Sequence, residues 1–182
     1  MLSPPDPDSR IGNLMGDFFH GPVIGFPANV ASGIRLHRAV DAFTDSHSMV
    51  VRSRRLVAGR FRHHSRIIVD ILYDHLLIDN WHLYETRPLD EFAEEIYGLL
   101  RERRESLSGP LHEAIPHLIG NRWLTRNRDL QGVEHSLRFL SGRMKRPVRM
   151  EEAVREFVGH EREFREHFDA FFPEVRAFVR TA

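Results

Sequence analysis

The sequence of 182 residues contains no cysteine, which excludes disulfide bonds, thiolate metal ligands and a cysteine nucleophile. It also lacks any apolar run long enough to span a membrane. Residues 1–9 are rich in proline and acidic side chains and do not show the charged and then apolar pattern of a secretory signal. We therefore expect a cytoplasmic protein without a membrane partner.

An excess of charge of either sign is also missing. The 26 basic and 26 acidic residues give a formal net charge of zero, and Lys145 is the only lysine. A neutral chain has no bulk electrostatic attraction to nucleic acid or to anionic lipid, and basic residues are not interleaved with aromatic ones. We therefore expect no nucleic-acid partner.

The alternating pattern of a β-strand is absent as well. The apolar residues recur at helical spacing, which predicts an all-α, single-domain helical bundle of about seven or eight helices. Residues 1–10 are expected to be an irregular N-terminal lead-in, and residues 11–182 one helical domain. Pro173 is expected to kink or break the last helix. The helices are expected at 11–19, 28–44, 49–61, 65–80, 89–106, 111–119, 131–140 and 150–179.

One predicted helix carries a polar face beside its apolar one. His37, Asp41 and Asp45 recur every four residues, so they share a face at the edge of the apolar stripe. Imidazole and carboxylate together suit a borderline or hard cation such as Mn²⁺, Fe²⁺, Zn²⁺ or Mg²⁺. The alternative is a solvated polar face that ends in a capping aspartate.

A second polar group lies in the most apolar predicted helix, at 65–80. Asp70 and Asp74 share one face, and His75 follows directly. A carboxylate in such surroundings must be protonated, paired or metal-bound. Bundle cores build metal sites from facing helices, so two such groups support a metal site. The alternative is an ion pair with Arg or His inside the bundle.

These groups, together with Asp17, would form a carboxylate-rich site with histidines. A metal there would lower the pKa of a bound water and stabilise charge on a phosphoryl oxygen, so hydrolysis of a phosphoester is the simplest reaction. Neighbouring arginines suit a phosphate contact, although solubilising surface charge is the alternative. They are Arg35, Arg38, Arg52, Arg54 and Arg55.

Five motifs, which occur in order along the chain, resemble those of the acyl carrier protein phosphodiesterases. The second motif, with the pattern GIxxHRxxDxxTD, is far more specific than an isolated His-x-x-x-Asp. The motifs are Gly12–Phe18, Gly33–Asp45, Asp70–Leu76 followed by Asn80-Trp81, Trp123–Asp129, and Phe171–Pro173.

The resemblance implies a helical fold like that of the HD-type metal phosphohydrolases. It also implies an Mn²⁺-dependent hydrolase, with Mg²⁺ or Fe²⁺ as other possible metals, that removes 4′-phosphopantetheine from holo acyl carrier protein. Carried onto this sequence, the implied metal ligands are Asp17, His37, Asp41 and Asp74, with Asp45 as a further candidate. The implied catalytic residues are Asp70 and His75, as acid/base or supporting groups, and Arg38, as a phosphate contact.

The sequence departs from the family at its start. Family members usually open with a segment of the type Asn-[Phe/Tyr]-Leu-Ala-His, where this chain has Met1–Pro7. A histidine that contributes to the family's site is thus missing, through either truncation or divergence.

The carrier proteins are acidic, so the resemblance also implies docking on arginines. Candidate segments are 52–66, 101–104 and 143–149. Two rival hypotheses remain. One is an HD-like hydrolase of another small phosphoester or a nucleotide, and the other is a catalytically silent helical protein that binds a carrier.

Overall fold

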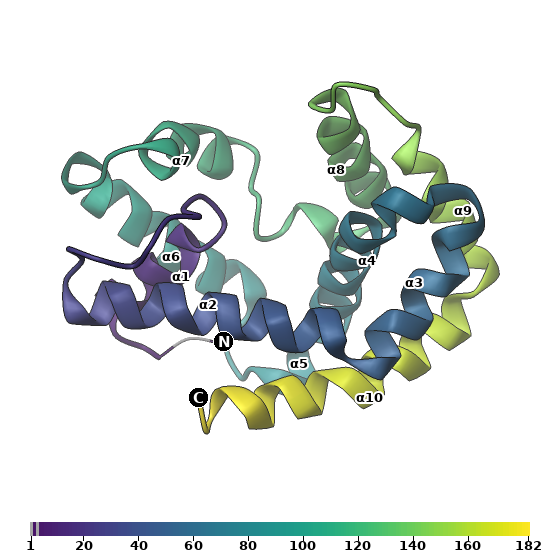
Figure 1. The fold of residues 1–182 in the computed structure, drawn as a ribbon, viewed down its shortest axis with the longest axis horizontal. Coiled ribbons are helices and arrows are strands. Elements are labelled where there is room, and N and C mark those ends of the chain that lie inside the picture. Colours follow the sequence, from purple (N-terminus) through teal and green to yellow (C-terminus); the bar gives the residue numbers. More distant parts are fainter. Residues whose placement is uncertain (1, 3) are drawn as a thin grey trace.

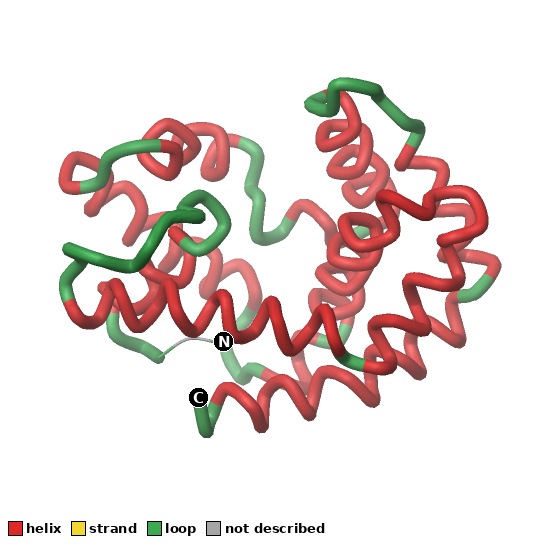
Figure 2. Tube along the Cα trace, viewed as in Figure 1, coloured by secondary structure: helices red, strands yellow, loops and turns green. Residues whose placement is uncertain are grey.

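The computed structural model describes residue 2 and residues 4–182, and Met1 and Ser3 lie outside this part of the chain. The described residues form helices and loops without a β-strand (Figure 2), which confirms the all-α prediction. None of these helices is long and apolar enough to cross a membrane.

Apart from the first, the α-helices lie close to the predicted segments, although there are more of them than the seven or eight expected. The additions are two short helices, the four-residue α5 inside a predicted connection and the seven-residue α9. The helices are α1 (Pro7–Met15), α2 (Ala28–Ser46), α3 (Ser48–Phe61), α4 (Ser65–Asp79), α5 (Trp81–Tyr84), α6 (Leu89–Arg103), α7 (Pro110–Gly120), α8 (Leu130–Gly142), α9 (Ala153–Gly159) and α10 (Glu161–Val179).

The helices pack around two separate apolar clusters. The larger cluster joins α3, α4, α8, α9 and α10, and the smaller one joins α1, α6 and α7. Figure 1 shows these groups on opposite sides of the molecule, with α2 and α10 along one edge. α2 packs on α1 at one end and contacts α3 and α10 at the other. This long helix therefore connects the two halves of the fold.

The expected irregular lead-in is wrong from Pro7 onward. The Asp6 side chain accepts a hydrogen bond from the Ser9 backbone N–H at 2.8 Å and caps α1, and Pro7 occupies the first helical position. An aspartate followed by proline is a favourable helix start, because proline lacks only a donor that would be unpaired there. The same helix ends at Met15 instead of Phe19.

The long helix expected at 150–179 is also divided. α9 ends at Gly159, and α10 begins at Glu161. α10 then continues through Pro173, so the expected break there is wrong. Pro173 has no N–H to offer the Asp169 carbonyl, and both residues are exposed, so this side of the helix is open to water. Buried phenylalanines and Val175 hold the helix on both sides of the proline.

α1 and α2 cross at very short range because α2 has a glycine at the contact. A Cβ atom at Gly33 would lie only 2.1 Å from the Ser9 carbonyl oxygen, so no larger residue fits this crossing. The close contact brings the C-terminal end of α1 against the middle of α2. The chain that leaves α1 therefore begins directly beside His37.

Candidate functional site

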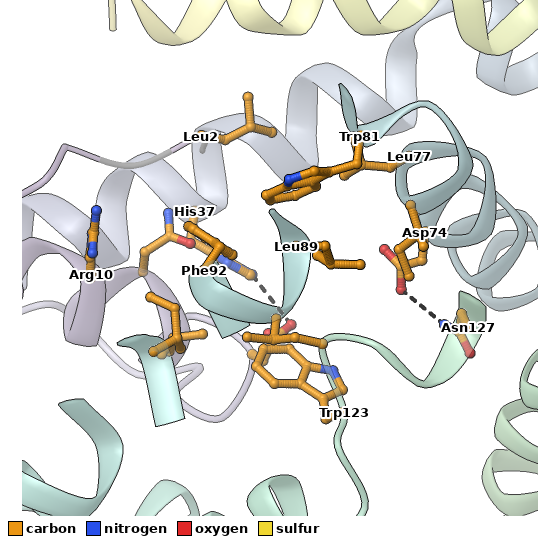
Figure 3. Close-up of a pocket in the computed structure, with 16 residues that line it drawn as sticks. Leu2, Arg10, His37, Asp74, Leu77, Trp81, Leu89, Phe92, Trp123 and Asn127 are labelled. Atoms are coloured by element: carbon orange, nitrogen blue, oxygen red, sulfur yellow. Dashed lines mark hydrogen bonds and ion pairs between the residues drawn. The ribbon is translucent and has the colours of Figure 1, made fainter. Parts of the chain in front are cut away.

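A cavity of about 310 Å³ lies between the two halves of the fold. Most of its wall is apolar, with aromatic residues from α5, α6 and the turn before α8. Figure 3 shows Asp74 and Asn127 at one side of this cavity and Arg10 at the other. The polar lining residues are Arg10, Asn13, Asp17, His37, Asp74 and Asn127.

His37 faces two carboxylates from different segments. Its Nε2 lies 3.4 Å from Asp41 Oδ2, one turn along α2, and 3.6 Å from Asp17 Oδ1, just beyond α1. The contact with Asp41 raises the pKa of His37 and lowers that of Asp41. Desolvation raises the pKa of Asp17. The Nε2 atom of His37 therefore has a carboxylate on α2 and another just beyond α1 as neighbours.

This arrangement depends on a glycine at the end of α1. A Cβ atom at Gly16 would lie 2.2 Å from Cγ of the His37 ring. The imidazole therefore occupies the space that a side chain at Gly16 would need. Because Gly16 contacts the ring, the next residue, Asp17, lies near His37 Nε2.

Asp70 and Asp74 come from α4, on the other half of the fold. Both residues are exposed by surface area, yet enough protein surrounds their carboxylates to desolvate them partly. This desolvation raises the pKa of Asp70 to about 6 and that of Asp74 to about 7. The charges of Asp70 and Asp17 raise the pKa of Asp74 further. Mutual repulsion of this kind favours a bound cation.

Asn127 supports Asp74 from the 3₁₀ turn η3 (Arg126–Arg128). Its Nδ2 is 3.5 Å from Asp74 Oδ2, and its Oδ1 accepts a hydrogen bond from Ser136 Oγ at 2.7 Å. Ser136 thereby fixes the orientation of the amide, so that the NH₂ group points at the carboxylate. Asn127 itself is buried.

The chemistry of these donors fits a divalent metal. Carboxylate oxygens and one imidazole nitrogen are ligands for Mn²⁺, Fe²⁺ or Mg²⁺. Desolvation raises the pKa values of Asp17 and Asp74, and the repulsion between these two carboxylates raises that of Asp74 further, so a cation between them would be stabilised. Within the described part of the chain, no three His, Asp or Glu side chains already converge as a ligand set.

The comparison with known protein families identifies the family of the chain. The sequence profile for "Acyl carrier protein phosphodiesterase" matches residues 1–175. The chain belongs to the acyl carrier protein phosphodiesterase family. This finding confirms the family predicted from the five motifs.

Individual members of the phosphodiesterase family are similar over most of their length. The acyl carrier protein phosphodiesterase of Photorhabdus laumondii is 31% identical over 167 residues, which cover 91% of this chain and 84% of that protein. The enzyme of Pectobacterium atrosepticum is 29% identical, with 95% and 91% covered. That of Escherichia coli O157:H7 is 29% identical, with 93% and 89% covered. No solved structure matches the chain.

Two residues that the family resemblance pointed to are held by other groups. Asp45 lies one turn beyond Asp41 and pairs with Arg54 at 2.6 Å and Arg66 at 2.9 Å. Arg38 Nη2 donates to the carbonyl oxygens of Phe19 and Gly21 at 2.9 and 2.8 Å, and it thereby anchors the loop after Asp17. The structure thus places neither Asp45 at His37 nor the Arg38 guanidinium in the cavity wall.

His75 is likewise not brought into the cavity. The side chain is only 8% exposed, and its Nδ1 donates to the backbone carbonyl of Asn127 at 2.9 Å. Its ring packs edge-on against Phe157, with the centroids 5.7 Å apart. His75 therefore joins α4 to the turn that holds Asn127, and its acid/base role stays a prediction.

Several residues of this wall have no functional role predictable from the sequence. Asn127, Trp81 and Trp123 belong to motifs shared with the family, but no pattern in the sequence assigns them a role in a site. A polar turn and isolated tryptophans carry no periodic signal. Their place in the cavity follows from the packing of distant segments, which spacing along the chain does not reveal.

Proposed function

We propose that this chain hydrolyses the phosphodiester of holo acyl carrier protein to give apo carrier and free 4′-phosphopantetheine. The main support is the position of Asp17, His37 and Asp74 on one cavity, in a chain whose relatives are named acyl carrier protein phosphodiesterases. We further propose that Asp17, His37, Asp41 and Asp74 hold Mn²⁺. The likeness to HD-type phosphohydrolases stays a prediction, since no solved structure matches.

The proposed reaction is attack of water on the phosphorus. The bond between phosphorus and the carrier's serine oxygen breaks, the water oxygen stays on the phosphopantetheine, and a proton goes to the serine oxygen. A bound Mn²⁺ would lower the pKa of water and offset the charge on the phosphoryl oxygens.

Within this reaction, Asp70 is the proposed acceptor of the water proton. It does not line the cavity, but it lies near enough to Asp41 for that charge to raise its pKa. Its pKa of about 6 leaves it ionised at neutral pH and still basic enough to take a proton. Asn127 would hold Asp74 in place, because its amide orientation is fixed by Ser136. His37 lies between two carboxylates that keep its ring directed at the cavity.

Docking of the acidic carrier is proposed for α3 and the turn that follows it. Arg52, Arg55 and Arg62 are exposed and form no ion pair with another described residue. Arg54 and Arg66, in the same region, are close enough to Asp70 to lower its pKa. A carrier bound to this arginine face would therefore lie beside the acidic end of the site. Segment 101–104 is less suitable, because Arg101 and Arg103 are paired. Segment 143–149, in which Arg149 is paired with Glu152, stays a second candidate.

A substrate panel with Mn²⁺ separates this proposal from its rivals. Holo carrier should lose its prosthetic group, while cyclic nucleotides and mononucleotides should react far more slowly. Faster turnover of a nucleotide would favour the small-phosphoester alternative. Tight carrier binding without turnover, with or without Mn²⁺, would favour a silent binding protein.

A further inference from the structure

The cavity extends well beyond the carboxylates, and this apolar part has no role in cleaving a phosphodiester. Its walls include Leu77 and Ile78 from α4, and Leu89, Phe92 and Ile96 from α6. Pockets that are mostly apolar, with a few well-placed polar groups, are typical of small-molecule sites. The space therefore suits a ligand portion that continues from the phosphate.

Two tryptophans form opposite sides of this space. Figure 3 shows Trp81 and Trp123 across the cavity from each other, with Leu89 and Phe92 between them. The Trp81 Nε1 donates to the Arg87 carbonyl at 2.7 Å, and its ring lies 5.1 Å from that of Phe92. Trp81 is thus a fixed wall. These are the only two tryptophans of the sequence, and both line the cavity.

Two polar groups that line the cavity lack partners in the protein. Neither the Asn13 carboxamide nor the Trp123 Nε1–H forms a hydrogen bond with another described residue, and both residues are only partly exposed. A purely hydrocarbon ligand would take water from these groups without replacing its hydrogen bonds, which costs free energy. A ligand with amide groups would replace those bonds.

We propose that this cavity binds the pantetheine arm, and that Asn13 and Trp123 hydrogen-bond its amides. This inference rests on the proposed function, which places the phosphate at Asp17, His37 and Asp74. The arm would run from there between the two indoles towards Arg10. Arg10 is itself paired with Glu95 and forms a charged end to the cavity. The arm remains in the cavity after cleavage, so free phosphopantetheine should bind and inhibit.

The test uses intrinsic tryptophan fluorescence with two probes, pantetheine and 4′-phosphopantetheine, on the metal-free and the Mn²⁺-loaded protein. Both probes should change the emission saturably. Pantetheine lacks the phosphate, so its affinity should change less than threefold on addition of Mn²⁺. Absence of a saturable change with either probe, confirmed by calorimetry, would overturn the inference.

Substitutions identify the contacts. Asn13→Leu and Trp123→Phe should each weaken pantetheine binding about tenfold, the usual effect of leaving one amide hydrogen bond unmade. Asn29→Leu, at an exposed position of α2 outside the cavity wall, is the matched control and should bind normally. Decanoate is the competing probe. If Asn13→Leu binds decanoate more tightly and pantetheine no less tightly, the cavity is an acyl-chain site and the inference is wrong.

Failure of the pantetheine-binding inference can be distinguished from failure of the proposed hydrolysis of holo carrier. Release of apo carrier from holo carrier without any pantetheine binding would overturn only the inference. Pantetheine binding without release of apo carrier would overturn only the proposed reaction.

Discussion

Gly16 and His37 are in direct contact, and the imidazole ring fills the space where a side chain at Gly16 would begin. A Cβ there would lie 2.2 Å from His37 Cγ, far below an ordinary contact distance. The position of the proposed metal-binding histidine is therefore set by a glycine on a different helix.

Gly16→Ala should displace His37 and weaken Mn²⁺ binding at least tenfold, as measured by calorimetry. Gly98→Ala is the matched control, since Gly98 lies inside α6 and a Cβ there meets nothing within 4 Å. The control should bind Mn²⁺ normally and gain about 0.5–1 kcal/mol of stability, because alanine is the better helix former. Equal Mn²⁺ affinity in the two variants would show that His37 is not a ligand.

Asp74→Asn should stabilise the metal-free protein, and more so as the pH rises. The pKa of Asp74 is about 7 in the fold, against an ordinary value of 3.8. The folded state thus holds this proton more tightly, so its stabilising effect is complete below pH 3.8 and is lost as the pH rises through about 7. In the presence of a chelator, the Tm difference between the variant and the parent should therefore grow from pH 5 to pH 8. A constant difference would contradict the raised pKa.

Arg38→Lys should weaken Mn²⁺ binding and lower kcat. Lysine cannot reproduce the two hydrogen bonds from one guanidinium nitrogen to the carbonyls of Phe19 and Gly21, so the loop that begins at Asp17 would loosen. If Arg38 instead contacts the substrate phosphate, as the family resemblance implies, the result would differ. Inhibition by inorganic phosphate would then weaken in Arg38→Lys, while the Mn²⁺ affinity would stay unchanged.

Arg55→Glu should lower kcat/KM for the carrier about tenfold at low ionic strength, with kcat little changed, because a rim charge acts mainly on association. Arg162→Glu is the control, on an exposed face of α10 beside Glu166. Added salt should reduce the difference between Arg55→Glu and the parent. A rate that does not depend on salt in either protein would exclude electrostatic docking.

Much of the fold follows from local patterns in the sequence. The spacing along 28–44 and 65–80 predicted α2 and α4 within about two residues, because each carries an uninterrupted apolar stripe. The errors arise where a single residue acts against its usual tendency. Pro173 remains inside α10 because its neighbours are anchored in the core, and Pro7 begins a helix instead of preventing one.

In the candidate site, too, some contacts follow from local spacing in the sequence and others depend on tertiary packing. The pairing of His37 with Asp41 is a helical repeat, so it could be predicted from spacing alone. The support of Asp74 by Asn127 joins residues 53 positions apart. It depends on how η3 packs against α4, which only the tertiary structure determines. The pairing of Asp45 on α2 with Arg66 on α4 depends on tertiary packing in the same sense, whereas Arg54 is only nine residues from Asp45.

The most direct test of the account is an intact-mass measurement of holo acyl carrier protein incubated with this chain and Mn²⁺ in ¹⁸O-labelled water. We expect the carrier to fall to its apo mass without label, and the released phosphopantetheine to carry one ¹⁸O. Chelator or Asp41→Ala should prevent both changes. A carrier of unchanged mass, or label on the carrier instead of on the phosphate, would contradict water attack on the phosphodiester at this site.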